Sequence, residues 1–177
     1  MTEHLAFSIV KSENLSEHER AEILALCSRA YRINYEPFLK TFTDATHVIA
    51  RQQGRLVSHA LWVTRWLQPG PLPPLRTAFV EAVATEEEYR GQGLATAVMK
   101  KLSSAINDFE LGGLSPAQYG LYTRLGWELW RGPLFIRTKD GLLPTPDDEV
   151  MILRLPDTPV LDLDWSLSAE WRGGELW

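Results

Sequence analysis

The stretch FVEAVATEEEYRGQGLA, residues 79–95, combines an apolar strand, a short acidic turn and a glycine-rich loop that opens a helix. The helix is predicted because apolar residues recur every three or four positions after the loop, at Leu94, Val98, Leu102, Ala105 and Phe109. The first turn of a helix carries unpaired backbone N–H groups and the positive end of the helix dipole. Glycines at 91 and 93 let a ligand approach that backbone closely, so the stretch predicts a phosphate-binding loop.

Two kinds of loop fit this segment. The Rossmann fingerprint needs a third small residue and an acid about twenty residues later, but Thr96 takes the first position and Glu110 fits the second only roughly. The alternative pattern, Arg/Gln-x-x-Gly-x-Gly/Ala, is matched by Arg90, Gly93 and Ala95. This pattern resembles the acetyl-CoA pyrophosphate loop of the GNAT acyltransferase superfamily. The resemblance implies that acetyl-CoA is bound by Val83, Thr85, Arg90, Gly91, Gln92, Gly93, Leu94 and Ala95.

A second segment, SPAQYGLYTRLGW at residues 115–127, lies at the distance that the family would place it. Ser115 suits an N-cap, Pro116 the first helical position and Gly126 the residue past the end, which predicts a helix from about 116 to about 125. The order Leu-Tyr followed by Arg-Leu-Gly-Trp resembles the second conserved GNAT segment, and this resemblance names Tyr122 as the general acid. The alternative is that this tyrosine packs its ring in a core.

The composition fits a small enzyme. A chain of 177 residues that is 45% hydrophobic predicts one domain, residues 1–177, with a proper core. A net charge of -5 without a basic run argues against a nucleic-acid partner. No apolar run approaches a membrane span and no signal peptide is recognised, so we expect no membrane partner and a cytoplasmic protein. The single cysteine, Cys27, is expected to be a buried small hydrophobe, which excludes a disulfide within the chain.

Residue patterns also predict the order of the elements. Helices are expected from the capping box at Ser16 to about Tyr31, briefly within 32–46, after the glycine loop and at 116–125. A hairpin turn is expected at 53–54 and loops at 69–74 and 144–148. The expected strands are 5–11, 47–52, 55–67, 75–84, 110–114, 127–138 and 149–155. Antiparallel strands followed by a strand-helix-strand-helix unit indicate an α/β fold. The GNAT resemblance implies a mixed, mostly antiparallel twisted sheet flanked by helices, with acyl-CoA bound at its splayed centre.

The strand at 75–84 carries the candidate base. Alternation places Thr77, Phe79, Glu81 and Val83 on one face of this strand, so Glu81 lies between apolar neighbours. Such a carboxylate either pairs with a cation as part of the structure or has a raised pKa and a chemical role, and both readings stay open here. Because a protonated amine has no lone pair to attack with, acyl transfer to an amine needs a base. Glu81, directly or through a water, is the candidate for that base.

The resemblance supplies the rest of the reaction. The amine would attack the thioester directly in a ternary complex, while backbone N–H groups near Val83 hold the thioester carbonyl. Tyr122, with an ordinary pKa of about 10, would protonate the departing thiolate. Neither a serine-histidine-acid nor a cysteine-histidine arrangement competes, and the four histidines show no metal spacing, so we expect no metal. His59, inside an apolar strand, is expected to be a satisfied core or groove histidine, with a substrate role as the alternative.

The C-terminal EWRGGELW, residues 170–177, resembles the C-terminus of the aminoglycoside 2'-N-acetyltransferases, Asp-Trp-Arg-x-Gly-Asp-Val-Trp. Further matches lie at 111–115, 126–133 and 137–148, so the resemblance covers essentially the whole chain. It implies that the substrate is bound by Ser115, Asp148, Glu175 and the terminal carboxylate of Trp177, near Glu81. Grouped carboxylates suit a substrate with several ammonium groups. Alternatively, the short tail is a packing strap.

The chain also departs from that family. The loop after the first helix offers Asn34, Tyr35 and Glu36 where the family has aspartates, and Glu170 and Glu175 replace aspartates in the tail. Three hypotheses therefore stay open: an acetyltransferase for aminoglycosides or related amines, a GNAT enzyme for another small amine or peptide amine, and a non-catalytic acyl-CoA-binding module. The presence of both the candidate base and the candidate acid argues against the third. Family resemblance also suggests a homodimer.

Overall fold

The computed structural model describes residues 5–177, which divide into two compact units. The first unit contains residues up to 63 together with 81–104, and the second contains 64–80 together with 105–177. Each unit is thus built from two stretches of chain that are separated in the sequence. Strands β3, Arg55–Pro69, and β4, Leu75–Thr85, each begin in one unit and end in the other. That the chain forms a single domain stays a prediction.

The first unit contains three antiparallel strands, as predicted. Strand β1, Leu5–Lys11, pairs with β2, Thr46–Gln52, which pairs with β3. The hairpin between β2 and β3 turns at Gln53 and Gly54, whose φ angles are 51° and 82°. Two successive positive φ angles are typical of a two-residue turn that matches the twist of its strands.

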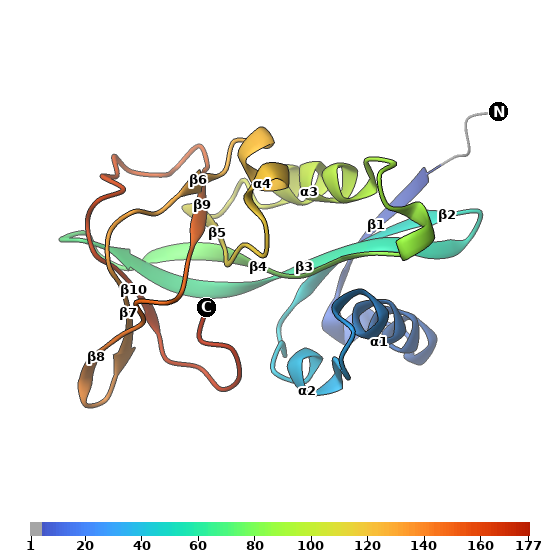
Figure 1. The fold of residues 1–177 in the computed structure, drawn as a ribbon, viewed down its shortest axis with the longest axis horizontal. Coiled ribbons are helices and arrows are strands. Elements are labelled where there is room, and N and C mark those ends of the chain that lie inside the picture. Colours follow the sequence, from blue (N-terminus) through green and yellow to red (C-terminus); the bar gives the residue numbers. More distant parts are fainter. Residues whose placement is uncertain (1–4) are drawn as a thin grey trace. The chain divides into compact units, whose positions relative to one another are not determined.

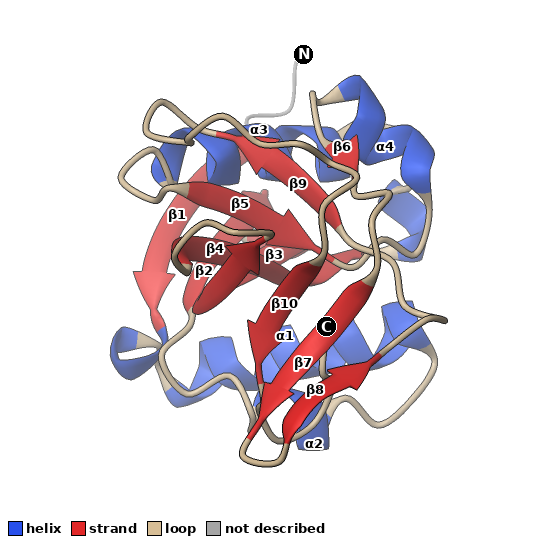
Figure 2. Cartoon of the chain, turned by 90° about the vertical axis from the view of Figure 1, so that its left-hand side faces the viewer, coloured by secondary structure: helices blue, strands red, loops and turns tan. Residues whose placement is uncertain are grey.

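Helices lie on both faces of this sheet (Figures 1 and 2). Helices α1, Glu17–Tyr31, and α2, Glu36–Leu39, lie on one face, and α3, Leu94–Ala105, lies on the other. The capping box that starts α1 is formed as predicted, because Ser16 accepts from the Glu19 amide while the Glu19 carboxylate accepts from the Ser16 amide. Short 3-10 turns occur at η1, Ser12–Asn14, and η2, Glu87–Tyr89. None of the helices within residues 5–177 is long and apolar enough to span a membrane.

The core of the first unit lies between α1 and the strands. Its α1 members are Ile23, Leu26 and Cys27, which are at most 2% exposed, and they pack in one cluster with apolar residues of β2 and β3. Cys27 is therefore the buried hydrophobe that the sequence predicts, and burial raises the pKa of its thiol to about 12. A thiol held in this form is not a nucleophile at neutral pH.

The second unit contains a mixed sheet in the order β6-β9-β5-β4-β3-β10-β7-β8. The β4–β5 and β7–β10 pairs are parallel, whereas β3–β10, β5–β9, β6–β9 and β7–β8 are antiparallel. The predicted fold class, a mostly antiparallel α/β sheet flanked by helices, is confirmed. The remaining strands are β5 Leu111–Leu114, β6 Glu128–Leu129, β7 Leu134–Thr138, β8 Gly141–Pro144, β9 Met151–Arg154 and β10 Leu167–Glu170. Figure 2 shows β7, β8 and β10 side by side.

The predicted helix at 116–125 is shorter than expected. Helix α4 covers Tyr119–Arg124 and its N-cap is Gln118, not Ser115. Gln118 has an extended backbone, with φ -156° and ψ 143°, so the residues before it cannot continue the helix. The predicted end is right, because Gly126 takes a φ of 87° directly after the last turn.

The predicted strand at 127–138 is interrupted, since β6 and β7 are separated by the bend around Gly132 and Pro133. A side chain at Gly132 would begin 1.8 Å from the carbonyl oxygen of Trp165, so only glycine allows this close crossing. Pro133 adds a residue without a backbone donor. Strands β8 and β10 were not predicted at all.

Candidate active site

Strand β4 carries Glu81 next to an irregularity in its backbone. Ala82 has a φ of 52°, a left-handed conformation that is unfavourable for a residue with a side chain. The regular pleat of the strand is interrupted at Ala82. The alternation of side chains between the two faces, which was used to place Glu81, therefore does not continue unchanged beyond this residue. Glu81, Val83 and Thr85 are half-buried, whereas Ala82 and Ala84 are buried.

The parallel ladder of β4 with β5 ends just before this irregularity. Its paired residues run from Thr77 opposite Leu111 to Val80 opposite Leu114. Residues 81–85 extend β4 beyond that ladder. Backbone amides that leave a ladder become available to a ligand or to side-chain partners.

The glycine-rich loop follows and begins α3. Gly91 and Gly93 have φ angles of 77° and 79°, and a Cβ at either position would meet no atom within 4 Å. The first helical hydrogen bond joins the Ala97 amide to the Gly93 carbonyl at 3.0 Å, so the amides before Ala97 precede the helical ladder. The exposed backbone of this loop therefore lies at an open helix start, a place where anions are favoured in proteins.

The side chains around the loop hold it in place. Leu94 is 8% exposed and anchors the first turn of α3, and Ala95 is half-buried. The Gln92 side chain donates to the Glu88 carbonyl at 3.3 Å, which ties the loop to the preceding acidic turn. Arg90 is exposed and in an extended conformation, so its guanidinium can reach a bound anion.

Tyr122 lies on α4 in the second unit and is 7% exposed. Its ring meets the edge of Trp127, with ring centroids 6.3 Å apart and planes at 67°. Burial raises the pKa of the Tyr122 hydroxyl above its ordinary value, so the group stays protonated at neutral pH. The ring of Tyr122 is thus packed in a core, as the alternative interpretation of the sequence predicted. Its hydroxyl nevertheless keeps the protonated state that a general acid needs.

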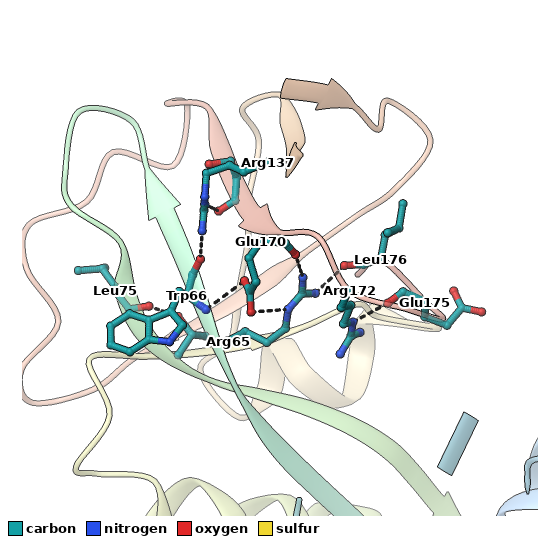
Figure 3. Close-up of polar contacts among 10 residues, drawn as sticks. Arg65, Trp66, Leu75, Arg137, Glu170, Arg172, Glu175 and Leu176 are labelled. Carbon is teal, nitrogen blue, oxygen red and sulfur yellow. Dashed lines mark hydrogen bonds and ion pairs between the residues drawn. The ribbon is translucent and has the colours of Figure 1, made fainter. Parts of the chain in front are cut away.

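The C-terminal tail is fixed by a buried arginine, as Figure 3 shows. Arg65, on β3, is 1% exposed and donates to the backbone carbonyls of Glu170 at 2.7 Å and Leu176 at 2.5 Å. Its guanidinium also lies 5.9 Å from the ring centroid of Trp177. A buried arginine that binds two carbonyls of the last eight residues holds the tail in one conformation.

The end of the tail meets the loop that carries Asp148. The indole N–H of Trp177, a residue only 4% exposed, donates to the Thr145 hydroxyl at 2.8 Å, and the Asp148 amide donates to the Thr145 carbonyl. Thr145 and Asp148 both line a cavity of about 610 Å³. The structure therefore brings together two predicted substrate residues, Asp148 and Trp177.

The other two predicted substrate residues are exposed. Glu175 lies in the tail, where its carbonyl accepts from the Arg172 guanidinium, and its carboxylate is accessible. Ser115 follows β5 and is exposed instead of capping a helix. Glu81 and the acetyl-CoA residues belong to the first unit, and Tyr122 and the substrate residues belong to the second.

Comparisons with known proteins show which family the chain belongs to. Residues 11–130 match the family model described as an acetyltransferase (GNAT) domain. The chain is also 35% identical over 163 residues to the aminoglycoside 2'-N-acetyltransferase of Mycolicibacterium fortuitum, covering 84% of this chain and 83% of that protein. The chain belongs to the GNAT family. GNAT enzymes are acetyl-CoA-dependent N-acetyltransferases, which is the activity that the loop and strand predict.

Solved GNAT structures share the fold. The Escherichia coli GNAT protein YhbS, solved in complex with CoA, matches with a TM-score of 0.67 and 17% identity, covering 97% of this chain and 92% of that one. A GNAT protein from Kribbella flavida matches with a TM-score of 0.60 and 19% identity, covering 75% of this chain. The match spans only 34% of the length of the Kribbella flavida protein.

Sequence reasoning missed several residues of this GNAT chain. Arg65 was not singled out, although an arginine between the apolar residues of this long strand could have signalled a buried anchor. His59 was predicted to be a satisfied core histidine, and this is confirmed: it is fully buried, with both ring nitrogens hydrogen-bonded. Its partner His47 was not predicted.

Proposed function

We propose that this chain transfers the acetyl group of acetyl-CoA to a primary amine of an amino sugar, the 2'-amine of an aminoglycoside or a closely related compound. The observation that carries the proposal is the pair of positive-φ glycines at the start of α3, which follow the Glu81-bearing strand after one short 3-10 turn. The 35% identity to an aminoglycoside 2'-N-acetyltransferase supports the acceptor class.

The donor is held by the loop and by the backbone of β4. Amides at the start of α3 and the Arg90 guanidinium bind the pyrophosphate, since the first helical turn and a cation both favour anions. The Val83 and Thr85 amides bind the acyl arm, and the Val83 N–H donates to the thioester carbonyl. Negative charge that develops on this oxygen during attack is stabilised by the same N–H group.

Glu81 and Tyr122 move the protons. Glu81, directly or through a water, takes a proton from the ammonium group, which frees the nitrogen lone pair. The nitrogen then bonds to the thioester carbonyl carbon as the carbon-sulfur bond breaks, and no acyl-enzyme forms. The Tyr122 hydroxyl gives its proton to the departing thiolate, which is why its protonated state at neutral pH matters.

The acceptor is bound by carboxylates of the second unit. Asp148, at the cavity beside Thr145, and the exposed Glu175 supply negative charge for a polyammonium substrate, and the terminal carboxylate of Trp177 adds to it. Ser115 supplies a hydroxyl for sugar oxygens. The anchoring of the tail by Arg65 limits the motion of Glu175 and Trp177, which reduces the entropy lost on binding.

The test is a coupled thiol-release assay with acetyl-CoA and a panel of acceptors. The panel contains aminoglycosides with and without a 2'-amine, simple polyamines, monoamines and a peptide with a free amine. We expect release that requires the 2'-amine. Turnover only with other amines would retain the mechanism and replace the substrate, and absence of release with every acceptor despite acetyl-CoA binding would indicate a non-catalytic binding module.

A further inference from the structure

Three successive backbone carbonyls of β4, those of residues 82–84, each accept a hydrogen bond from a side chain. The His59 Nδ1–H donates to the first at 2.9 Å, the Tyr31 hydroxyl to the second at 3.0 Å and the Ser58 hydroxyl to the third at 3.1 Å. A strand ladder would satisfy such carbonyls with backbone amides. Side-chain donors therefore bind this part of β4, where the backbone of Ala82 turns left-handed.

We propose that Tyr31, Ser58 and His59 form a polar clamp that sets the direction of the donor-binding amides of β4. They are positioning residues, because they contact the strand and not the reacting atoms. The inference rests on the proposed function, in which the Val83 and Thr85 amides bind the acyl arm.

The planarity of the peptide bond connects the clamp to those amides. The carbonyl of one residue and the N–H of the next lie in the same rigid plane and point in opposite directions. Fixing the Ala82 carbonyl with His59 therefore fixes the Val83 N–H. In the same way, fixing the Ala84 carbonyl with Ser58 fixes the Thr85 N–H. Tyr31 acts on the peptide between these two: its bond to the Val83 carbonyl fixes the plane that joins Val83 to Ala84 and so limits how far either neighbouring peptide can rotate.

The hydrogen positions of the clamp follow from its chemistry. A carbonyl only accepts, so His59 must carry its proton on Nδ1, and its neutral Nε2 must then accept. That acceptor is met by the His47 Nδ1 at 2.9 Å, and the Nε2 of His47 in turn accepts from the Ser12 hydroxyl at 2.9 Å. The series of hydrogen bonds from Ser12 through both histidines to Ala82 thus runs in one direction, with each group donating to the next.

The hydrogen bonds of Ser58 also include the side chain of Thr85. Because its single hydroxyl proton goes to the Ala84 carbonyl, the Thr85 hydroxyl, 2.8 Å away, must donate to the Ser58 oxygen. Ser58 and His59 are both fully buried, so no water replaces these bonds at low cost. A left-handed alanine persists only where its surroundings impose it, and the clamp supplies that constraint.

The test compares Tyr31→Phe and Ser58→Ala with Ser104→Ala. Ser104 also donates to a backbone carbonyl, that of Lys100, but on the exposed side of α3, so it is the matched control. Affinities for acetyl-CoA and for CoA are measured by calorimetry without an acceptor, and the amide NMR shifts of residues 83–85 are recorded without any ligand. Loss of one such bond should weaken acetyl-CoA binding roughly twofold to tenfold and displace those amide shifts. The control should change neither.

His59 is tested by a pair of variants. His59→Asn keeps a donor near the position of Nδ1, whereas His59→Leu keeps none, so the asparagine should retain more acetyl-CoA affinity. If the leucine variant does not fold, the Tyr31 and Ser58 variants still decide the question. Folded variants with unchanged affinity and unchanged amide shifts would overturn the clamp. A wild-type protein that binds neither CoA nor acetyl-CoA would instead overturn the proposed function, and the ligand-free amide shifts would still test the clamp.

Discussion

At the scale of single residues, Tyr122 combines a packed ring with a hydroxyl that burial keeps protonated. We expect Tyr122→Phe to lower kcat by about 100-fold or more, which is typical for loss of a general acid. The equilibrium constant for acetyl-CoA should change little, because the ring remains to pack against Trp127. Steady-state kinetics together with calorimetry separate the two effects, and unchanged kcat would remove Tyr122 from the mechanism.

The hydrogen-bonded histidine pair should make stability depend on pH. Burial lowers the pKa of His47 to about 4, with a further contribution from the Arg20 charge. Burial, the neighbouring His47 and, in the opposite direction, the bond to the Ala82 carbonyl leave the pKa of His59 at about 3. In the unfolded chain both rings return to an ordinary pKa of about 6.5, so below that pH the unfolded state binds more protons.

The stabilisation is therefore fully present above pH 6.5 and is lost as pH falls toward 4. Between pH 7.5 and 5 we expect the free energy of unfolding to drop by about 2 kcal/mol for His47 alone. Urea unfolding at the two pH values measures this drop. His47→Gln should reduce it, because the glutamine amide takes up no proton in this pH range. An equal pH dependence in the His47 variant would show that the His47 ring takes up protons equally in the folded and the unfolded state.

At the scale of elements, the glycine loop should tolerate a neutral side chain better than a charged one. Gly93→Glu should abolish acetyl-CoA binding because a carboxylate beside the helix start repels the phosphates. The protein itself offers open space there, so a clash within the fold is not the cause. Gly93→Asn is the matched variant, since asparagine tolerates a positive φ and carries no charge. Calorimetric titration with acetyl-CoA should show partial affinity for asparagine and none for glutamate; equal losses would indicate backbone strain.

Elements that are specified locally could be predicted from the sequence. The capping box at Ser16 and Glu19 starts α1 where expected, and the turn at Gln53 and Gly54 joins its two strands. Each of these signals depends on residues close together in the chain. The glycine loop at 90–95 is specified in the same local way, which is why its position at the start of α3 could be predicted.

Elements that depend on distant partners could not be predicted. Strand β10 forms because it pairs with β7 and β3, and its four residues carry no strand signal of their own. The bend at Gly132 depends on the carbonyl of Trp165, 33 residues further along the chain by number. In the same way, a left-handed Ala82 held by His59 cannot be inferred from the pattern of β4, because the donor comes from another strand.

At the scale of the whole molecule, the C-terminal tail should act on the acceptor and not on the donor. Deleting Trp177 removes the indole bond to Thr145 and moves the terminal carboxylate onto Leu176, whose carbonyl oxygen Arg65 binds. We expect KM for polyamine acceptors to rise roughly tenfold, the size typical of losing a charge-assisted bond, with little change for acetyl-CoA. Trp171→Ala is the control, because that tail residue is 61% exposed. Equal losses for every acceptor would identify the tail as a packing strap.

The acidic balance of the chain should appear as a salt dependence of acceptor binding. The net charge is -5, and the proposed acceptor carries several ammonium groups, so long-range attraction contributes to their encounter. Added salt shortens the distance over which charges attract, the Debye length, to about 10 Å at 0.1 M. Because this attraction weakens, KM for a polyammonium acceptor should rise several-fold between about 0.02 and 0.3 M salt. A monoamine acceptor in the same assay should show a much weaker rise, because it offers one charge to the same field. Equal salt dependence for both would mean that the acceptor is recognised by its shape and neutral groups, and the carboxylates at 148 and 175 would then lose their assigned role.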